Sequence, residues 1–321
     1  MIKKITQYLL QRRCALSLLL MLMLLQPAMA QTQDRRMYAR LDRETQTLTL
    51  YYDKNEQASD IEIDDTPLWP ISERRAIQTV VFDESFKDAR PKSCYTWFWC
   101  FEGLTRIEHL DYLNTSEVEV MQSMFSFCTS LETLDLSSFN TEKVKNMYAM
   151  FDGSTNLRSI KLPQGFIGSS VTNLFSMFKD CTSLTELDLS GSNSENVKDM
   201  SEMFYGCRAL SKLVLTDFKT GQVSTMESMF LGCSTLETLD VSSFNTENVT
   251  TMVGMFNNCS SLRSLDLTGF NTANVTGMSS MFKKCSSLRS LDLSSFNTRK
   301  VTQMQCMFQE CTNLESIDFS S

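Results

Sequence analysis

A motif of the form Met-Phe-x-x-Cys-x-x-Leu recurs eight times in this chain of 321 residues, at a step of about 26 residues, with Ser154 once in place of Cys. A fixed period of roughly 20 to 50 residues is typical of stacked repeats in which each unit contacts only its neighbours. The repeat therefore predicts a solenoid rather than a globule with one central cleft. The phenylalanines of the motif are Phe125, Phe151, Phe178, Phe204, Phe230, Phe256, Phe282 and Phe308.

Each repeat divides into an extended part and a turn-rich part, as residues 236–261 illustrate. Leu239 and Val241 alternate with Asp240, which predicts a short strand with the two apolar side chains inward and the carboxylate outward. Turn-forming residues follow in the segment Ser-Ser-Phe-Asn-Thr. The next apolar residues are spaced by 3, 3, 1 and 3, which fits one face of a helical or 3₁₀ segment, although a short extended piece is also compatible: Val249, Met252, Met255, Phe256 and Cys259.

The repeats and their flanks predict an α/β fold, a leucine-rich-repeat-like solenoid of about ten coils. We expect parallel strands roughly 4.8 Å apart on one face and short helical or extended segments on the other. Residues 131–321 hold the regular repeats, and residues 77–130 hold two degenerate capping coils that open at Ile77 and Leu104. In residues 31–76 we expect a small β-hairpin and a loop, because alternating segments flank a polar stretch at 42–46. An aromatic cluster is expected to cover the N-terminal end of the stack: Tyr95, Trp97, Phe98, Trp99 and Phe101.

Residues 1–30 have the composition of a secretory signal peptide. Four basic residues precede an apolar run from Ala15 to Leu25, and a Pro-Ala-Met-Ala segment ends at Ala30. We expect cleavage after Ala30, and the apolar run is too short to span a membrane in the mature chain. Loss of the four positive charges takes the net charge from −8 to −12. So acidic a chain is expected to bind neither nucleic acid nor anionic lipid, and no membrane insertion is expected after cleavage.

The repeat unit resembles that of the BspA-like leucine-rich-repeat surface proteins of host-associated bacteria. The resemblance covers roughly residues 37–321 and is carried by the pattern Leu-x-x-Leu-Asp-Leu-Ser-Ser-Phe-Asn-Thr-x-x-Val-x-x-Met-x-x-Met-Phe-x-x-Cys, by Phe82–Phe86, by Trp97 with Phe98, and by residues 113–115. It implies an extracytoplasmic solenoid. Some members of that family are associated with adhesion to host matrix proteins such as fibronectin and fibrinogen, and with cell–cell aggregation. The resemblance does not carry a particular ligand to this chain.

Sulfur-containing residues follow the repeat. Fifteen methionines occupy two of its positions; copper binding is one interpretation, but Leu174 replaces one member, which favours methionine as core filling. The cysteine position is interpreted as a column of buried free thiols, because its members are odd in number and Ser154 interrupts them. Cys94 and Cys100 are the candidates for a disulfide, and Cys306 is expected to be exposed and unpaired. The column consists of Cys128, Cys181, Cys207, Cys233, Cys259, Cys285 and Cys311.

Aspartate recurs at the outward position of the predicted strand, where Lys161 and Val214 interrupt it. Like charges on neighbouring strands repel, at a cost of roughly 0.2–1 kcal/mol per pair, so solvation, neighbouring hydroxyls, a cation or a basic partner must offset it. Two interpretations stay open: a solvated acidic face that prevents edge-to-edge association, or a ligand-binding face. The interruptions favour a protein partner over a ladder of metal ions. The candidate ligand-binding residues are Asp135, Asp188, Asp240, Asp266, Asp292 and Asp318.

The sequence offers little for catalysis. His109 is the only histidine, so a His-based triad or a His-rich metal site is hard to build, and no glycine loop for phosphate is present. We expect no enzyme, no cofactor and no metal site. The predicted function is an exported, secreted or cell-surface bacterial protein that binds a host matrix or cell-surface protein, as an adhesin does. The alternatives are a structural component of the cell envelope whose rods self-associate, or a fragment of a longer surface protein; the stop at Ser321, directly after the last predicted strand, motivates both.

Overall fold

The N-terminal end of the fold is a hairpin that continues into the solenoid. The computed structural model describes residues 35–64, 67 and 69–320, so the signal peptide predicted at 1–30 lies outside the described residues. β1 (Arg36–Asp42) and β2 (Thr47–Asp53) pair antiparallel, in the segments where alternation predicts strands. β3 (Ile61–Glu62) pairs with the other edge of β1.

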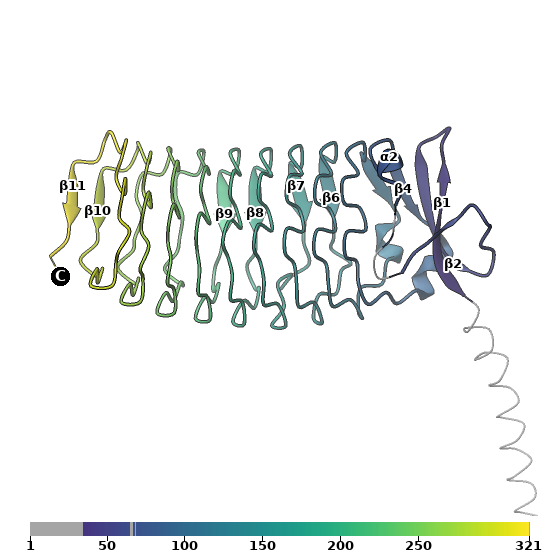
Figure 1. Ribbon diagram of the computed structural model, residues 1–321, viewed down its shortest axis with the longest axis horizontal. Helices are drawn as coiled ribbons and strands as arrows, with labels where there is room; N and C mark the ends of the chain where they lie inside the picture. Colours follow the sequence, from purple (N-terminus) through teal and green to yellow (C-terminus); the bar gives the residue numbers. More distant parts are fainter. Residues whose placement is uncertain (1–34, 65–66, 68, 321) are drawn as a thin grey trace, which may run out of the picture.

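This hairpin is not a separate unit. β2 pairs in parallel with β4 (Thr79–Phe82), and β4 pairs in parallel with β5 (Arg106–Glu108). The resulting five-stranded sheet has the order β3-β1-β2-β4-β5. The hairpin therefore covers the edge that the first coil of the solenoid would otherwise expose (Figure 1). Three short helical turns lie in the same region: α2 (Ile71–Arg74), η1 (Glu84–Asp88) and η2 (Leu110–Tyr112).

One side of the rod is a continuous ladder. Parallel bridges join nine successive coils, from Ser93 through Val120 to Gln303. In a typical coil the N–H groups of Met226, Ser228 and Phe230 donate to carbonyl oxygens of the next coil, at 3.2, 2.8 and 2.9 Å, while the intervening residues close turns within their own coil. These segments are thus successive turns and contain neither a regular helix nor a long strand. We call this side the ladder face: residues 93–101, 120–128, 146–154, 173–181, 199–207, 225–233, 251–259, 277–285 and 303–311.

The ladder depends on a backbone conformation that most residues avoid. In the ladder segment of each coil two residues have positive φ, for example Ser228 at 55° and Gly232 at 80°. Elsewhere the same two positions hold Glu202 and Phe127, which have φ of 57° and 58°. Positive φ is uncommon outside glycine and costs free energy. The inter-coil hydrogen bonds therefore hold the backbone in a conformation that the residue types alone would not select.

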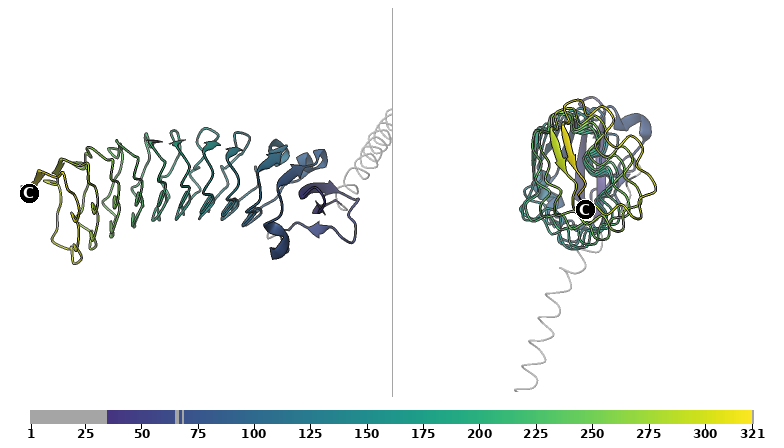
Figure 2. Two further views of the ribbon diagram at one scale, coloured as in Figure 1. Left: turned by 90° about the horizontal axis from the view of Figure 1, so that it is seen from above. Right: turned by 90° about the vertical axis from the view of Figure 1, so that its left-hand side faces the viewer.

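The opposite side carries the short strands, and we call it the strand face. β6 (Thr133–Asp135) pairs in parallel with β7 (Ser159–Lys161), β8 (Glu186–Asp188) with β9 (Lys212–Val214), and β10 (Ser290–Asp292) with β11 (Ser316–Asp318). Residues 239–241 and 265–267 have the same place in their coils without strand hydrogen bonding. The bridges of the ladder face are thus continuous, whereas strand pairing on this face is pairwise, with single backbone hydrogen bonds such as Thr185 to Arg158 between pairs. Viewed down the rod, the coils superimpose as one closed tube (Figure 2).

The interior consists of columns that run the length of the rod. The phenylalanine rings stack on their neighbours with centroids 5.2 to 5.8 Å apart. The methionines of the two columns are buried from Met121 to Met281, as expected for core filling. At the N-terminal end Trp97, Phe98 and Phe101 are fully buried, and Phe98 stacks on Phe125 at 5.4 Å. The predicted solenoid with parallel strands is confirmed.

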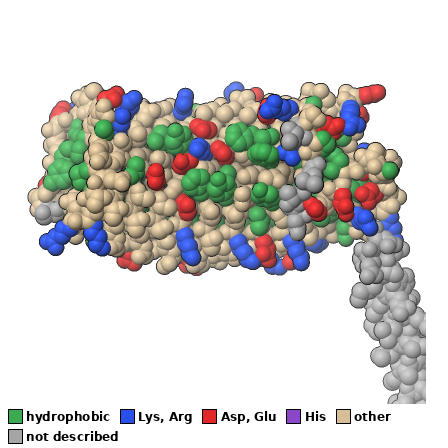
Figure 3. Space-filling view, in the orientation of Figure 1, with side chains coloured by type: hydrophobic (Ala, Val, Ile, Leu, Met, Phe, Trp, Pro, Cys, Tyr) green, Lys and Arg blue, Asp and Glu red, His purple; other side chains and the backbone are tan. Residues whose placement is uncertain are grey.

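Ion pairs on the surface link residues 26 positions apart. Lys143 lies 2.7 Å from Glu117, Lys145 lies 2.7 Å from Glu119, and Arg263 lies 3.0 Å from Glu237. Exposed pairs of this kind contribute little to stability individually, but each is formed only when the coils are in the observed register. In Figure 3 most basic side chains lie along the upper and lower edges of the rod, and acidic side chains are scattered between them.

Candidate functional site

The predicted aspartates lie on the strand face and share one local geometry. Each carboxylate accepts a hydrogen bond of 2.8 to 3.0 Å from the backbone N–H two residues further on, and three also accept one of 2.6 or 2.7 Å from the hydroxyl of that residue. The turn after each strand therefore has its own reason for an aspartate. The residues are Asp135, Asp188, Asp240, Asp266, Asp292 and Asp318.

These hydrogen bonds also help to offset the repulsion between carboxylates on neighbouring coils. They hold the pKa of five of the carboxyl groups below the usual range. Where Lys161 interrupts the column, its ammonium group lies 3.1 Å from Asp135. Hydroxyls, backbone N–H groups and one lysine thus stabilise the charges. Binding of a ligand by this face remains a prediction.

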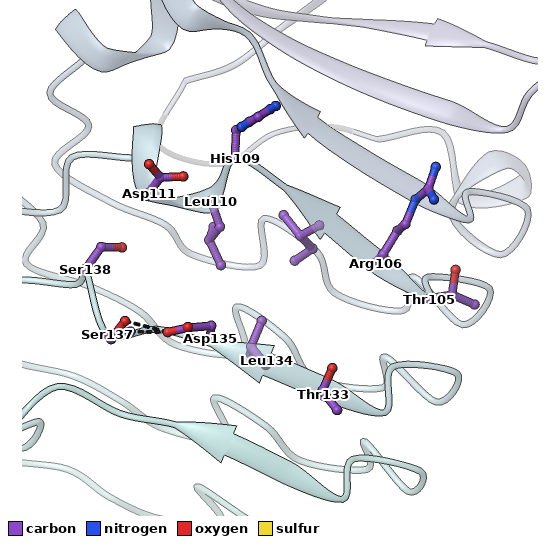
Figure 4. A pocket seen from close by; sticks show the side chains of 11 residues that line it. Thr105, Arg106, His109, Leu110, Asp111, Thr133, Leu134, Asp135, Ser137 and Ser138 are labelled. Atoms are coloured by element: carbon purple, nitrogen blue, oxygen red, sulfur yellow. Dashed lines mark hydrogen bonds between the residues drawn. The ribbon is translucent and has the colours of Figure 1, made fainter.

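A groove opens on the strand face where the sheet is interrupted. β5 pairs only with β4, and β6 only with β7. The space between β5 and β6 has a volume of about 470 Å³ and is lined by Arg106, His109, Asp111, Asp135 and Ser137 among others. Figure 4 shows His109 and Asp111 on one wall and the hydrogen-bonded Asp135 and Ser137 on the other. Sequence analysis did not find this groove, because its upper wall belongs to a degenerate capping coil that the repeat pattern does not describe.

Some side chains of the groove have partners within the protein. The Arg106 guanidinium lies 3.0 Å from Glu108. His109 has φ of 57° and stacks on Tyr112 with ring centroids 4.9 Å apart. Among the described residues of the groove, no hydroxyl is hydrogen-bonded to His109, so the nucleophile–base pair of covalent catalysis is not formed there. The groove is a polar recess of the strand face, lined by charged and hydroxyl side chains.

The cysteines described by the structure are all free thiols. In the column, each thiol donates to the carbonyl oxygen of a phenylalanine one coil earlier, for example Cys259 to Phe230 at 3.1 Å, and burial raises the pKa of Cys259 to about 12. The disulfide considered between Cys94 and Cys100 is not formed. Cys94 is fully buried and points into the core, whereas Cys100, at a position of positive φ, is partly exposed. Cys306 is exposed, as expected from the sequence.

Two further observations concern membranes and metals. Within residues 35–64, 67 and 69–320, no helix has both the length and the apolar character needed to cross a membrane. The same residues contain no group of three or more His, Cys, Asp or Glu side chains placed to hold a metal ion.

The fold and the surface together define a leucine-rich-repeat-like solenoid with a solvent-exposed acidic strand face. Residues 99–161, 164–237 and 211–320 match the family described as "Mycoplasma protein of unknown function, DUF285". Because these segments cover more than half of the chain, the protein belongs to this family. The bacterial repeat family that the sequence pattern predicted is thereby confirmed.

Several solved structures are similar to this chain. One is a leucine-rich cell surface protein from Faecalibacterium prausnitzii A2-165, with 16% identity, coverage of 88% of this chain and 93% of that chain, and a TM-score of 0.32. Leucine-rich repeat proteins from Bacteroides ovatus ATCC 8483 (14% identity, 88% and 92% coverage, TM-score 0.32) and Eubacterium ventriosum ATCC 27560 (14% identity, 88% and 82% coverage, TM-score 0.36) are two others. No curated protein sequence matches the chain.

Proposed function

We propose that this protein is exported to the bacterial surface and binds another protein through its solenoid without catalysing a reaction. The observation that carries the proposal is the strand face, which presents six aspartates in register along the rod. The turn hydrogen bonds occupy one oxygen of each carboxylate, and Lys161 occupies the second oxygen of Asp135, so the outer lone pairs of the other five are the ones offered to a partner. A basic surface on a host matrix or cell-surface protein is complementary to such a face, and electrostatic complementarity favours association.

A long, regular surface suits recognition better than catalysis. Solenoids bind through extended surfaces built from many coils, whereas an enzyme concentrates its groups in one pocket. The groove between β5 and β6 supplies no nucleophile or general base in reacting geometry. The composition of residues 1–30 supports export, and the resemblance to surface proteins supports a location on or outside the cell.

The test is saturable binding of residues 31–321 to surfaces coated with fibronectin or fibrinogen, and to whole bacterial and host cells. Replacing Asp240, Asp266 and Asp292 by Asn is expected to weaken binding, because Asn retains the turn hydrogen bond but removes the charge. A matched control replaces three other exposed acids by Gln: Glu44, Glu142 and Glu247. Absence of saturable binding to every protein and cell would refute the proposal. If the Asn and Gln variants lost binding equally, the strand face would not be the binding surface.

A further inference from the structure

The ladder face carries large apolar side chains on five adjacent coils, which we call the aromatic patch: Phe127, Tyr148, Phe175, Tyr205 and Leu231. All five are half-buried or exposed, and they stand at outward positions that several other coils fill with small or polar residues, although Tyr95, Trp99 and Val253 also occupy two of these positions. Ser201 and Ser279 take the place of Tyr148 and Phe175, and Ser126 and Asn257 take the place of Tyr205 and Leu231. The coil therefore does not need apolar residues there. Hydrophobic side chains and charges gather at mid-length on the face in view in Figure 3.

The patch has a defined geometry. Tyr148 and Phe175 stack with ring centroids 5.3 Å apart and planes 10° from parallel. Because they stack along the rod, their edges face outward, and the ring faces that meet are covered. The Phe127 side chain is 41% exposed. Its φ is 58°, an unusual conformation for a bulky residue. Its ring lies against Gly153, where a Cβ atom would stand 2.5 Å from it. The ladder imposes positive φ at this position of every coil, so the size and exposure of the ring, and not its φ, set Phe127 apart.

Acidic groups beside the rings outnumber their cationic partner. The Lys179 ammonium lies 5.0 Å from the centroid of the Tyr205 ring and 2.7 Å from Glu202, with which it forms an ion pair. The carboxyl groups of Asp152 and Asp180 form no hydrogen bond or ion pair with the residues that the structure describes. Burial raises the pKa of Asp152 to about 6, and the charges of Asp180 and Glu202 act in the same direction while Lys179 opposes them. Three acidic groups thus share the charge of Lys179 beside an apolar surface, where excess negative charge is costly.

We propose that the aromatic patch binds a protein segment in which Arg or Lys stands between apolar side chains. A guanidinium group can bind carboxylates through paired hydrogen bonds and can also pack on aromatic rings. The stacked rings offer the apolar contact, and aromatic and arginine residues are the usual anchors of protein interfaces. This inference rests on the proposed role as a protein-binding solenoid, but it assigns recognition to the ladder face as well. A second copy of the chain does not fit as the occupant, because the carboxylates that meet around a shared axis would repel.

The repeat itself supplies variants that should preserve the fold. Tyr148→Ser, Phe175→Ser and Tyr205→Asn, combined in one chain, introduce residues that other coils already carry at the same positions. The probe is a phage-displayed library of random dodecapeptides selected on immobilised residues 31–321, followed by synthesis of the enriched peptides with a fluorescent label. The variant with Asn at Asp240, Asp266 and Asp292 is the matched control, because it removes charge from the opposite face.

The expected result is enrichment of peptides with Arg or Lys between apolar residues. We expect the triple patch variant to weaken their binding by about tenfold or more, equivalent to about 1.4 kcal/mol, and the strand-face variant to bind normally. Binding should weaken between pH 7 and pH 5 as Asp152 gains a proton, and Asp152→Asn should abolish that dependence. No enrichment, enrichment without basic residues, or unchanged binding by the patch variant would overturn the inference. A dimer that depends on the patch in sedimentation experiments would also overturn it, in favour of self-association.

The two proposals fail separately. If fibronectin, fibrinogen and cells bind and the strand-face variant loses that binding, while no peptide selects the patch, only this inference is wrong. If peptides select the patch but none of those partners binds, the proposed role of the strand face is wrong and the ladder face is the recognition surface.

Discussion

The stack of phenylalanines makes a quantitative prediction, for which Phe256→Ala is the perturbation. Phe256 is fully buried and stacks on Phe230 at 5.6 Å and on Phe282 at 5.7 Å. Truncation of a buried Phe to Ala costs about 3–5 kcal/mol, and the two lost aromatic pairs account for about 1–3 kcal/mol of it. Phe308 is partly exposed and has one stacked neighbour in the column, Phe282. Phe308→Ala should therefore cost about 1–2 kcal/mol.

The assay is urea denaturation of residues 31–321, followed by far-UV circular dichroism. Because stacked repeats need not unfold in a single step, amide hydrogen exchange should accompany it, and in Phe256→Ala the increase in exchange should centre on residues 230–282. An equal cost for both variants, or a cost below about 1 kcal/mol for Phe256→Ala, would show that the stack is not the main source of cohesion between coils.

Three other predictions concern the surface and the backbone. Asp152 has a pKa raised from 3.8 to about 6, so its contribution to stability falls as pH rises through that window; Asp152→Asn should raise the melting temperature at pH 7.5 but not at pH 4, and equal shifts at both would contradict this. Asp240→Ala should lower the urea midpoint at pH 7 more than Asp240→Asn, because Asn keeps the turn hydrogen bond. The pKa of Asp240 is lowered, so the contribution of its charge to stability is lost as pH falls below 3.8. A difference in urea midpoint between wild type and Asp240→Asn that does not narrow below that pH would argue against this charge contribution. Gly153→Ala should cost about 1–3 kcal/mol in thermal melts, because φ is 70° and a Cβ would meet the Phe127 ring, whereas Gly269→Ala, with nothing within 4 Å, is the control expected to stay within about 0.5 kcal/mol.

The interior of the rod could be predicted because the period alone determines it. Once Phe230 and Phe256 are known to occupy equivalent positions of stacked coils, their contact follows, and so does the burial of the methionine, cysteine and leucine columns. The outward position of Asp240 followed from alternation in the same way. The turn that it caps was visible in the serine two residues later, which the sequence offered as one way to offset the charge.

The ladder face could not be predicted because its apolar spacing does not distinguish one conformation from another. Steps of three residues place Met252, Met255 and Phe256 on one side of a helix, and also on one side of a chain of three-residue turns. The residues with positive φ give only a partial signal: Gly153, Gly206 and Gly232 share one position, but Glu202 and Phe127, which have no preference for that conformation, also stand at positions of positive φ. The parallel pairing of β2 with β4 was hidden for another reason: it depends on contact between segments that the repeat does not relate.

The aromatic patch was missed although the sequence contains a signal for it. Attention to what repeats favours inward residues, whereas Tyr148, Phe175 and Tyr205 are informative because they do not repeat. Comparing each outward position across the coils, and asking where a large apolar residue replaces Ser or Asn, would have found them. In a solenoid the deviations from the pattern are the better guide to recognition.

The continuous ladder also has a mechanical consequence for a rod held at one end and pulled at the other. Its hydrogen bonds point along the rod, parallel to the pulling force. The coils are therefore expected to separate one after another rather than all together. Each coil that detaches converts a rise of roughly 4.8 Å into 26 extended residues, a gain on the order of 85 Å. Stretching single molecules should show steps of this size. A tether built this way lengthens in small increments under load and keeps its remaining coils, and the surfaces they carry, intact.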